Sequence, residues 1–260
     1  MSTPPPMTAP VPPASQPLQP GLSEPARLIN TFIAPRKTFE DLKVNSRWWV
    51  PFVLSAVITL GFGVIAGQKI DFVRFVEQQI ERSPKAQKRL EQATPEQREQ
   101  GIAIQAKITK ISFYAYFVVI FIGGLIFAAI LMAIFNFMLG AEVPFGRSLA
   151  VVFYSFFPWN LATILLGVSL LVSADPNTID FNNPMPTNPA FFLDPTGNKL
   201  IYGLLQGVEI FRIWAVVLLG LGFAAASSNR KPSTKTAITT TFVIYGILVL
   251  IGIGFKVVFS

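Results

Sequence analysis

Five long apolar runs, separated by polar or turn-rich segments, constrain the fold of this 260-residue chain more than any other feature. A helix of about 20 apolar residues is long enough to cross the ~30 Å hydrocarbon core of a bilayer. We therefore expect an all-α fold: an integral membrane bundle of five transmembrane helices, preceded by an amphipathic N-terminal lead-in helix. The expected spans cover residues of about 48–67, 111–139, 148–172, 205–228 and 237–259.

The composition agrees with this class and excludes several kinds of chemistry. Hydrophobic residues make up 52% of the chain and charged residues 13%, whereas about 25% of the residues in typical soluble domains are charged. The sequence has no cysteine and no histidine, which excludes disulfides, Cys/His metal sites and histidine-based catalytic triads. We expect no cofactor and no metal, and the sequence shows no basic face suited to nucleic acid.

The chain divides into a tail and a membrane domain. Residues 1–25 contain nine prolines among Ser, Thr, Gln and Ala, which leaves too little apolar surface to offset the entropy of ordering. This segment is predicted to be a disordered, Pro-rich cytoplasmic tail. Residues 26–258 form the predicted membrane domain, in which residues 68–110 make a helical loop outside the bilayer.

The first part of the membrane domain, residues 26–47, has an amphipathic pattern. Its apolar positions follow a helical period and are Leu28, Ile29, Phe32 and Ile33. The basic residues on the other side are Arg27, Arg36, Lys37, Lys43 and Arg47. We expect this segment to lie on the membrane surface, attracted to anionic headgroups, with a solvated helix as the alternative.

The distribution of Lys and Arg predicts the orientation. Residues 26–47 and the loops after the second and fourth spans are basic, whereas the loop after the third span offers only Lys199 against three aspartates. The positive-inside rule then places the N-terminus in the cytoplasm and the C-terminus outside. The loop 68–110 argues the other way, since it holds nine Lys/Arg, although with six acidic residues.

Two ionisable residues, Glu209 and Arg212, stand at the start of the fourth apolar run. Their spacing places them on one face of a helix, and charged groups in a bilayer usually face protein or water. A straight helix puts Glu209 ~29 Å from Asn229, near the opposite interface, where an arginine can extend outward. We interpret them as a structural pair that fixes the helix position; a transport or binding site is the alternative.

Three short aromatic and proline patterns occur in order along the chain. The first is Phe32-x-x-Pro35-x-x-Thr38-Phe39-x-x-Leu42 followed by Trp49 and Pro51, the second is Tyr154-Ser155-x-x-Pro158, and the third is Phe211-x-x-Trp214. Together they resemble the Yip domain family, named for Ypt/Rab-interacting proteins, in its prokaryotic branch. The resemblance covers roughly residues 26–258. The Asp-Leu-Tyr-Gly-Pro segment of the eukaryotic branch is absent.

The resemblance implies a helical membrane protein without enzymatic activity, located in a bacterial cytoplasmic membrane. Eukaryotic relatives act in vesicle trafficking by contacting Rab GTPases and one another. We expect a scaffold that contacts the lipid bilayer and other membrane proteins or itself. The residues proposed for structure or interaction are Glu209, Arg212, Trp214, Tyr154 and Pro158.

Two other functions remain open from the sequence. A transporter or channel component would use Glu209, Arg212, Asn136 and Asn160 inside the bundle. No inverted repeat is evident, and polar groups are sparse for a solute pathway. An intramembrane enzyme is less well supported, because Glu209 beside Arg212 makes a poor acid.

Overall fold

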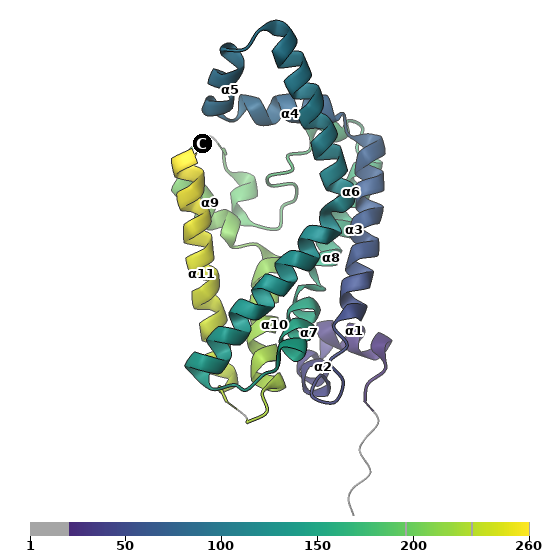
Figure 1. Ribbon diagram of the computed structural model, residues 1–260, viewed down its shortest axis with the longest axis vertical. Helices are drawn as coiled ribbons and strands as arrows, with labels where there is room; N and C mark the ends of the chain where they lie inside the picture. Colours follow the sequence, from purple (N-terminus) through teal and green to yellow (C-terminus); the bar gives the residue numbers. More distant parts are fainter. Residues whose placement is uncertain (1–20, 196, 230, 260) are drawn as a thin grey trace, which may run out of the picture.

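The five apolar runs fold into a bundle of helices, and strands are absent from the part of the chain that the structure describes (Figure 1). The structure is a computed structural model that describes residues 21–195, 197–229 and 231–259. Four helical segments are long and apolar enough to span a membrane, and a bent helix pair makes a fifth. The prediction of an all-α membrane bundle is confirmed.

Four of the five helical spans begin 3–16 residues earlier than predicted, and all five end within two residues of the predicted position. The spanning elements are α3 (Trp49–Lys69), α6 (Pro95–Ala133) with the π-helical turn η1 (Ile134–Met138), α7 (Phe145–Phe156) with α8 (Trp159–Val172), α9 (Lys199–Gly207) with α10 (Ile210–Ala226), and α11 (Thr234–Phe259). Pro158 separates α7 from α8, as expected for a proline that cannot donate a helical hydrogen bond. The fourth span bends by 54° between α9 and α10.

Two short helices, α1 (Glu24–Ile33) and α2 (Pro35–Asp41), close one end of the bundle (Figure 1). Phe39 and Leu42 are buried in the main hydrophobic core with residues of α7 and α10. Arg27 is only 1% exposed, so it does not line a polar surface as the amphipathic pattern suggested. The helix α1 also begins inside the predicted tail, whose first 20 residues lie outside the described part of the chain.

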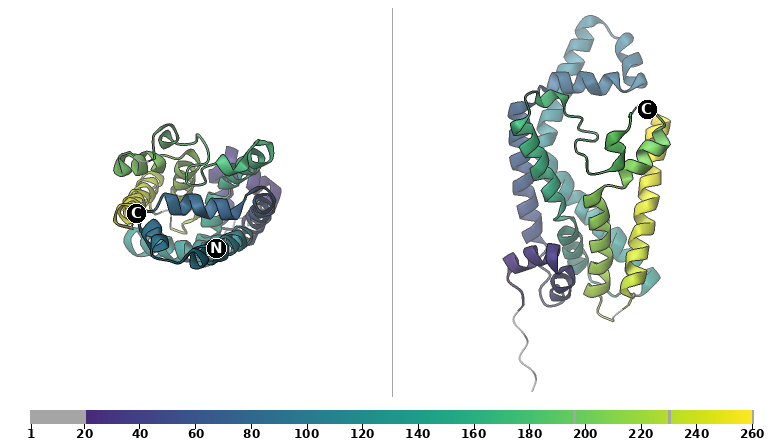
Figure 2. Two further views of the ribbon diagram at one scale, coloured as in Figure 1. Left: turned by 90° about the horizontal axis from the view of Figure 1, so that it is seen from above. Right: turned by 180° about the vertical axis from the view of Figure 1, so that it is seen from behind.

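The opposite end carries a structured cap, which we define as α4 (Phe72–Glu81), α5 (Pro84–Glu91) and the first turns of α6 (Figures 1 and 2). The long helix α6 starts with the capping box that Thr94 and Gln97 form, and it continues without interruption into the membrane. The cap is joined to the loop after α8, which contains the short helices η2 (Pro176–Thr178) and η3 (Pro189–Phe192). Arg82 pairs with Asp180 at 2.6 Å across this junction.

Close helix contacts depend on glycines. A Cβ on Gly220 would lie 2.6 Å from the Cα of Ile238 in α11, and one on Gly63 would lie 2.7 Å from the carbonyl oxygen of Phe113 in α6. Gly222 lies against Val151 and Phe39 in the same way. These glycines are therefore used in contacts within the bundle.

Candidate intramembrane site at Arg212

The break in the fourth span places a helix start inside the membrane. Glu209 has extended backbone angles and is the N-cap of α10. Its carboxylate accepts hydrogen bonds from the backbone N–H groups of Phe211 at 3.1 Å and Arg212 at 2.8 Å. A negative charge at a helix N-terminus is stabilised by these free N–H groups and by the helix dipole. The Glu209 charge is thus directed at the backbone of α10.

The start of α10 lies beside the second half of α11. The Tyr245 hydroxyl donates to the carbonyl of Gly207 at 2.5 Å, and a Cβ on Gly207 would lie 3.1 Å from Val249. Tyr245 and Val249 lie ~16 and ~22 Å along α11 from its first residue, Thr234, at 1.5 Å per residue. The bend comes before Glu209, so it leaves the length of α10 between Glu209 and Ala226 unchanged.

Arg212 lies beside one aromatic ring and one hydroxyl, those of Trp159 and Tyr245. Its guanidinium carbon lies 5.4 Å from the centre of the Trp159 ring, in cation–π geometry. Its Nε atom is buried without a hydrogen-bond partner. Within the described ranges, no carboxylate lies within ion-pair distance of the Arg212 guanidinium, and Glu209 meets Arg212 at its backbone N–H instead.

A cavity of about 290 Å³ lies beside the guanidinium. It is enclosed by α6, α7, α8, α10 and α11, and its lining residues other than Arg212, Thr241 and Tyr245 are apolar or aromatic. The Thr241 hydroxyl bonds to backbone carbonyls, as the Tyr245 hydroxyl does. Arg212 is therefore the one charged residue among those that line the cavity.

The cavity reaches the outer surface of the bundle. Leu248 and Trp159, both in its lining, are 48% and 38% exposed. Because these residues belong to membrane-spanning helices, their exposed surface faces lipid. We name this cavity, with Arg212 in its wall, the Arg212 pocket.

A second polar cluster holds α1 and α2 against the bundle. The buried Arg27 guanidinium pairs with Asp41 and with Glu24, the latter at 3.1 Å. The Tyr154 hydroxyl of α7 donates to the same Glu24 carboxylate at 2.9 Å. The Thr38 hydroxyl donates to the backbone carbonyl of Arg27. We call these residues the Arg27 cluster; every charge in it has a partner, as buried charges require.

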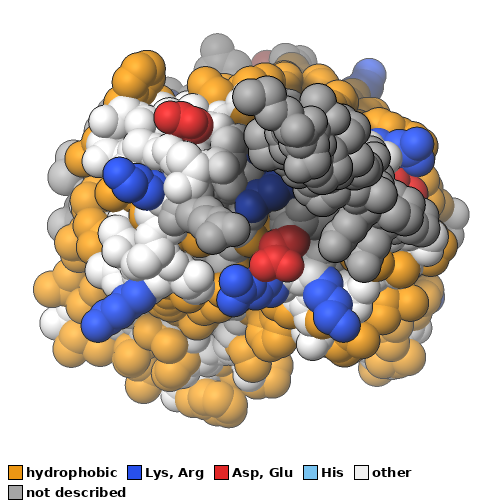
Figure 3. Space-filling view, turned by 90° about the horizontal axis from the view of Figure 1, so that it is seen from below, with side chains coloured by type: hydrophobic (Ala, Val, Ile, Leu, Met, Phe, Trp, Pro, Cys, Tyr) orange, Lys and Arg blue, Asp and Glu red, His pale blue; other side chains and the backbone are white. Residues whose placement is uncertain are grey.

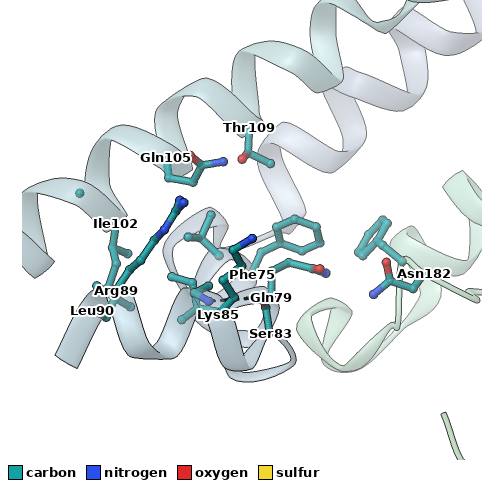
Figure 4. A pocket seen from close by; sticks show the side chains of 15 residues that line it. Phe75, Gln79, Ser83, Lys85, Arg89, Leu90, Ile102, Gln105, Thr109 and Asn182 are labelled. Carbon is teal, nitrogen blue, oxygen red and sulfur yellow. Dashed lines mark hydrogen bonds between the residues drawn. The ribbon is translucent and has the colours of Figure 1, made fainter. Parts of the chain in front are cut away.

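A third feature is a groove of about 800 Å³ in the cap, between α4, α5 and α6 (Figure 4). Phe75, Ile102 and Leu90 give it an apolar floor, and the close-up shows Lys85 and Arg89 at its side. The loop after α8 contributes Phe181 and Asn182. The groove lies outside the membrane-spanning part of the bundle.

A family model described as the Yip1 domain matches residues 29–254. The chain belongs to the Yip1 domain family. The match begins in α1 and ends in α11, so it includes all five apolar runs and confirms the family that the three aromatic and proline patterns suggested. No curated protein and no solved structure gives a significant match.

The residues of this Yip1 domain that the sequence suggested as functional have different structural roles. Trp214 is 44% exposed and turned away from the core. Asn136 exchanges two hydrogen bonds with the backbone of Val143 and so holds the turn after α6. Asn160 donates to the Ser55 hydroxyl at 2.8 Å, which links α8 to α3.

Sequence reasoning missed two parts of this Yip1 domain. The acids Glu24 and Asp41 were not recognised as partners of Arg27, although the Glu24–Arg27 spacing is a helical one. Trp159 and Tyr245 were not connected with Arg212, because only the folded bundle brings α8 and α11 beside α10. The Glu24–Arg27 pair could have been found from the sequence, whereas the contacts of Asp41 with Arg27 and of Trp159 and Tyr245 with Arg212 could not.

Proposed function

We propose that this Yip1 domain protein is a non-enzymatic membrane scaffold, which organises its surroundings through contacts with lipids and with other membrane proteins. The proposal rests on the Arg27 cluster. This cluster fixes α1 and α2 to the core, so that the two helices form a rigid surface at one end of the bundle. A surface that is already ordered loses little entropy when a partner binds.

The chemistry of this surface supports contacts with acidic groups. Figure 3 shows basic side chains gathered on the face that α1, α2 and the neighbouring turns form. Its exposed basic residues are Arg36, Lys37, Lys43, Arg47, Lys231 and Lys235. Ile29 and Ile33 of α1 are 59% and 76% exposed, which suits insertion at the edge of a bilayer. Acidic proteins and anionic headgroups are the partners that such a face attracts.

This basic face also sets the proposed orientation. We place α1 and α2 in the cytoplasm of a bacterial cell and the cap outside the cytoplasmic membrane, following the positive-inside rule. The cap also contains basic residues, which argue for the reverse orientation, but some of them are paired with acidic residues. Arg82 pairs with Asp180 and Arg74 with Asp175, so two of these cations are matched by acids of the loop after α8.

Crosslinking in native membranes followed by affinity purification tests the scaffold. The informative variant is Arg36→Glu with Lys37→Glu, two exposed residues outside the Arg27 cluster. The matched control is Lys88→Glu with Arg89→Glu, an equal charge change on α5 of the cap. We expect a defined crosslinked partner that disappears in the first variant and remains in the control. Self-association alone, unchanged in both variants, contradicts the proposal.

The transporter alternative has one observation in its favour, the broken fourth span with a helix start and Arg212 inside the membrane. Discontinuous helices of this kind bind solutes in many transporters. Against it, Asn136, Asn160 and Glu209 are engaged in structural hydrogen bonds. Flux of anions into liposomes that contain the purified protein, lost in Arg212→Gln, is the result that would favour the alternative.

A further inference from the structure

The Arg212 pocket has the composition of a ligand site rather than of a structural contact. A guanidinium carries five N–H donors and is normally satisfied by several acceptors. Arg212 is partly buried, and its Nε atom is buried without a hydrogen-bond partner beside a cavity. Ionisable residues within a bilayer are costly and are typically retained for function. A ligand with an acceptor group would accept a hydrogen bond from Nε and would occupy the cavity.

The charge and polarity of the wall define the ligand. An anion is required opposite Arg212, and a carboxylate matches the guanidinium with two parallel hydrogen bonds. The hydroxyls of Thr241 and Tyr245 already bond to backbone carbonyls. The rest of the wall is apolar, so a ligand with further polar groups, such as a glycerophospholipid headgroup, would leave them unsatisfied.

The size and position of the pocket define the remainder of the ligand. The volume of about 290 Å³ lies just below the ~300–1,000 Å³ range of small-molecule sites. It has room for a carboxylate with the first part of a hydrocarbon chain. Leu248 and Trp159 form an edge that is open to the bilayer, through which the rest of a chain extends into lipid.

We propose that the Arg212 pocket binds the carboxylate of a long-chain fatty acid, taken laterally from the bilayer. Arg212 holds the carboxylate, Trp159 covers the guanidinium, and the apolar walls contact the first methylene groups. No covalent step is involved. The inference deepens the lipid-contact part of the proposed scaffold and rests on that function, but it concerns the inside of the bundle and not the α1–α2 face.

Tryptophan quenching by 2-bromopalmitate tests the site directly. The protein is reconstituted in phosphatidylcholine nanodiscs and titrated with this fatty acid, whose bromine lies next to the carboxylate and quenches a tryptophan that it contacts. The electron-withdrawing bromine keeps the acid ionised, and the chain has no cysteine for the reagent to alkylate. We expect saturable quenching that palmitate reverses and that is absent in Trp159→Phe.

The variants separate binding from partition into the bilayer. In Arg212→Gln we expect the apparent affinity to fall about tenfold or more, a change that corresponds to ~1.4 kcal/mol per factor of ten. Arg98→Gln, which removes an exposed arginine of the cap far from the pocket, is expected to bind like the unaltered protein. Leu248→Phe narrows the open edge without touching the charge, and it is expected to weaken binding even if Arg212→Gln does not fold.

Three results would overturn the proposal. The first is equal saturable quenching in the unaltered protein and in a folded Arg212→Gln variant. The second is equal quenching by methyl 2-bromopalmitate, which has no charge. The third is reversal by phosphatidylglycerol as effective as that by palmitate, which would assign the pocket to a phosphate. The partner crosslinking described above does not depend on this pocket, so failure here and failure of the scaffold proposal are distinguishable.

Discussion

The hydroxyl of Tyr154 in α7 donates a hydrogen bond of 2.9 Å to the carboxylate of Glu24, a residue 130 positions earlier in the sequence. This bond ties the first helix of the membrane domain to the centre of the bundle. Glu24 also accepts from Arg27, which in turn pairs with Asp41 at the end of α2. One tyrosine therefore takes part in fixing both short helices.

Removal of the hydroxyl in Tyr154→Phe is expected to lower the free energy of unfolding by roughly 1.5–3 kcal/mol, the range for hydrogen bonds to charged groups. Unfolding by steric trapping in bicelles measures this. Tyr116→Phe is the control, since Tyr116 is 53% exposed and its change is expected to stay within ~0.5 kcal/mol. Equal effects of the two variants would show that the Tyr154–Glu24 bond contributes little.

Replacement of Arg27 by Met is expected to cost more, about 3–5 kcal/mol, because it leaves the Asp41 and Glu24 carboxylates without their buried cation. The exposed pair of Arg36 and Glu40 provides the comparison. Arg36→Met is expected to change the free energy of unfolding by at most ~0.5 kcal/mol. Protease sensitivity of α1 and α2 is a second readout, and a protected α1 in a folded Arg27→Met protein would contradict the role given to the cluster.

Glycines that look alike in the sequence are expected to respond differently to alanine. Gly220→Ala forces a Cβ against the backbone of Ile238 and is expected to cost ~1–3 kcal/mol through overpacking. Gly246→Ala meets nothing within 4 Å, and it is expected to be neutral or to stabilise α11 by up to ~1 kcal/mol. Thermal unfolding in detergent compares them, and the opposite ranking would refute the assigned α10–α11 packing.

The charges of Glu209 and Arg212 are expected to act independently. Glu209→Ala removes the cap of α10 and should cost ~0.5–2 kcal/mol. Arg212→Gln leaves the backbone N–H groups that Glu209 binds in place. A double-mutant cycle of these two changes is therefore expected to give a coupling energy below ~0.5 kcal/mol. A coupling well above 1 kcal/mol would restore the interpretation as an interacting pair.

The sequence was sufficient for the helices and for the family, because both depend on local patterns. Long apolar runs specify spans, and Thr94 with Gln97 marks the start of α6. The break at Glu209 was missed, since hydropathy continues across residues 205–228 and the contact of Tyr245 with the Gly207 carbonyl at the bend exists only in the folded bundle.

The position of Arg27 was also mispredicted for a physical reason. An amphipathic pattern shows which residues share a face, but not whether that face meets lipid, water or protein. Glu24 lies one turn from Arg27 in α1, but Asp41 of α2 approaches Arg27 only after α2 folds back along α1. The Arg212 pocket likewise requires five helices to be in place before it exists.

The helix α6 with its π-helical end runs through 44 residues from the cap to the turn that Asn136 holds. At 1.5 Å per residue its contour length is ~66 Å, about twice the thickness of the hydrocarbon core. The helix changes direction along its course (Figure 1), and its last turn is π-helical. The cap and the opposite face of the membrane are nevertheless joined by one uninterrupted helical segment. We therefore expect spin labels at Arg98 and Phe137 to report correlated motion, and independent motion of the two labels would show that the bend in α6 acts as a hinge.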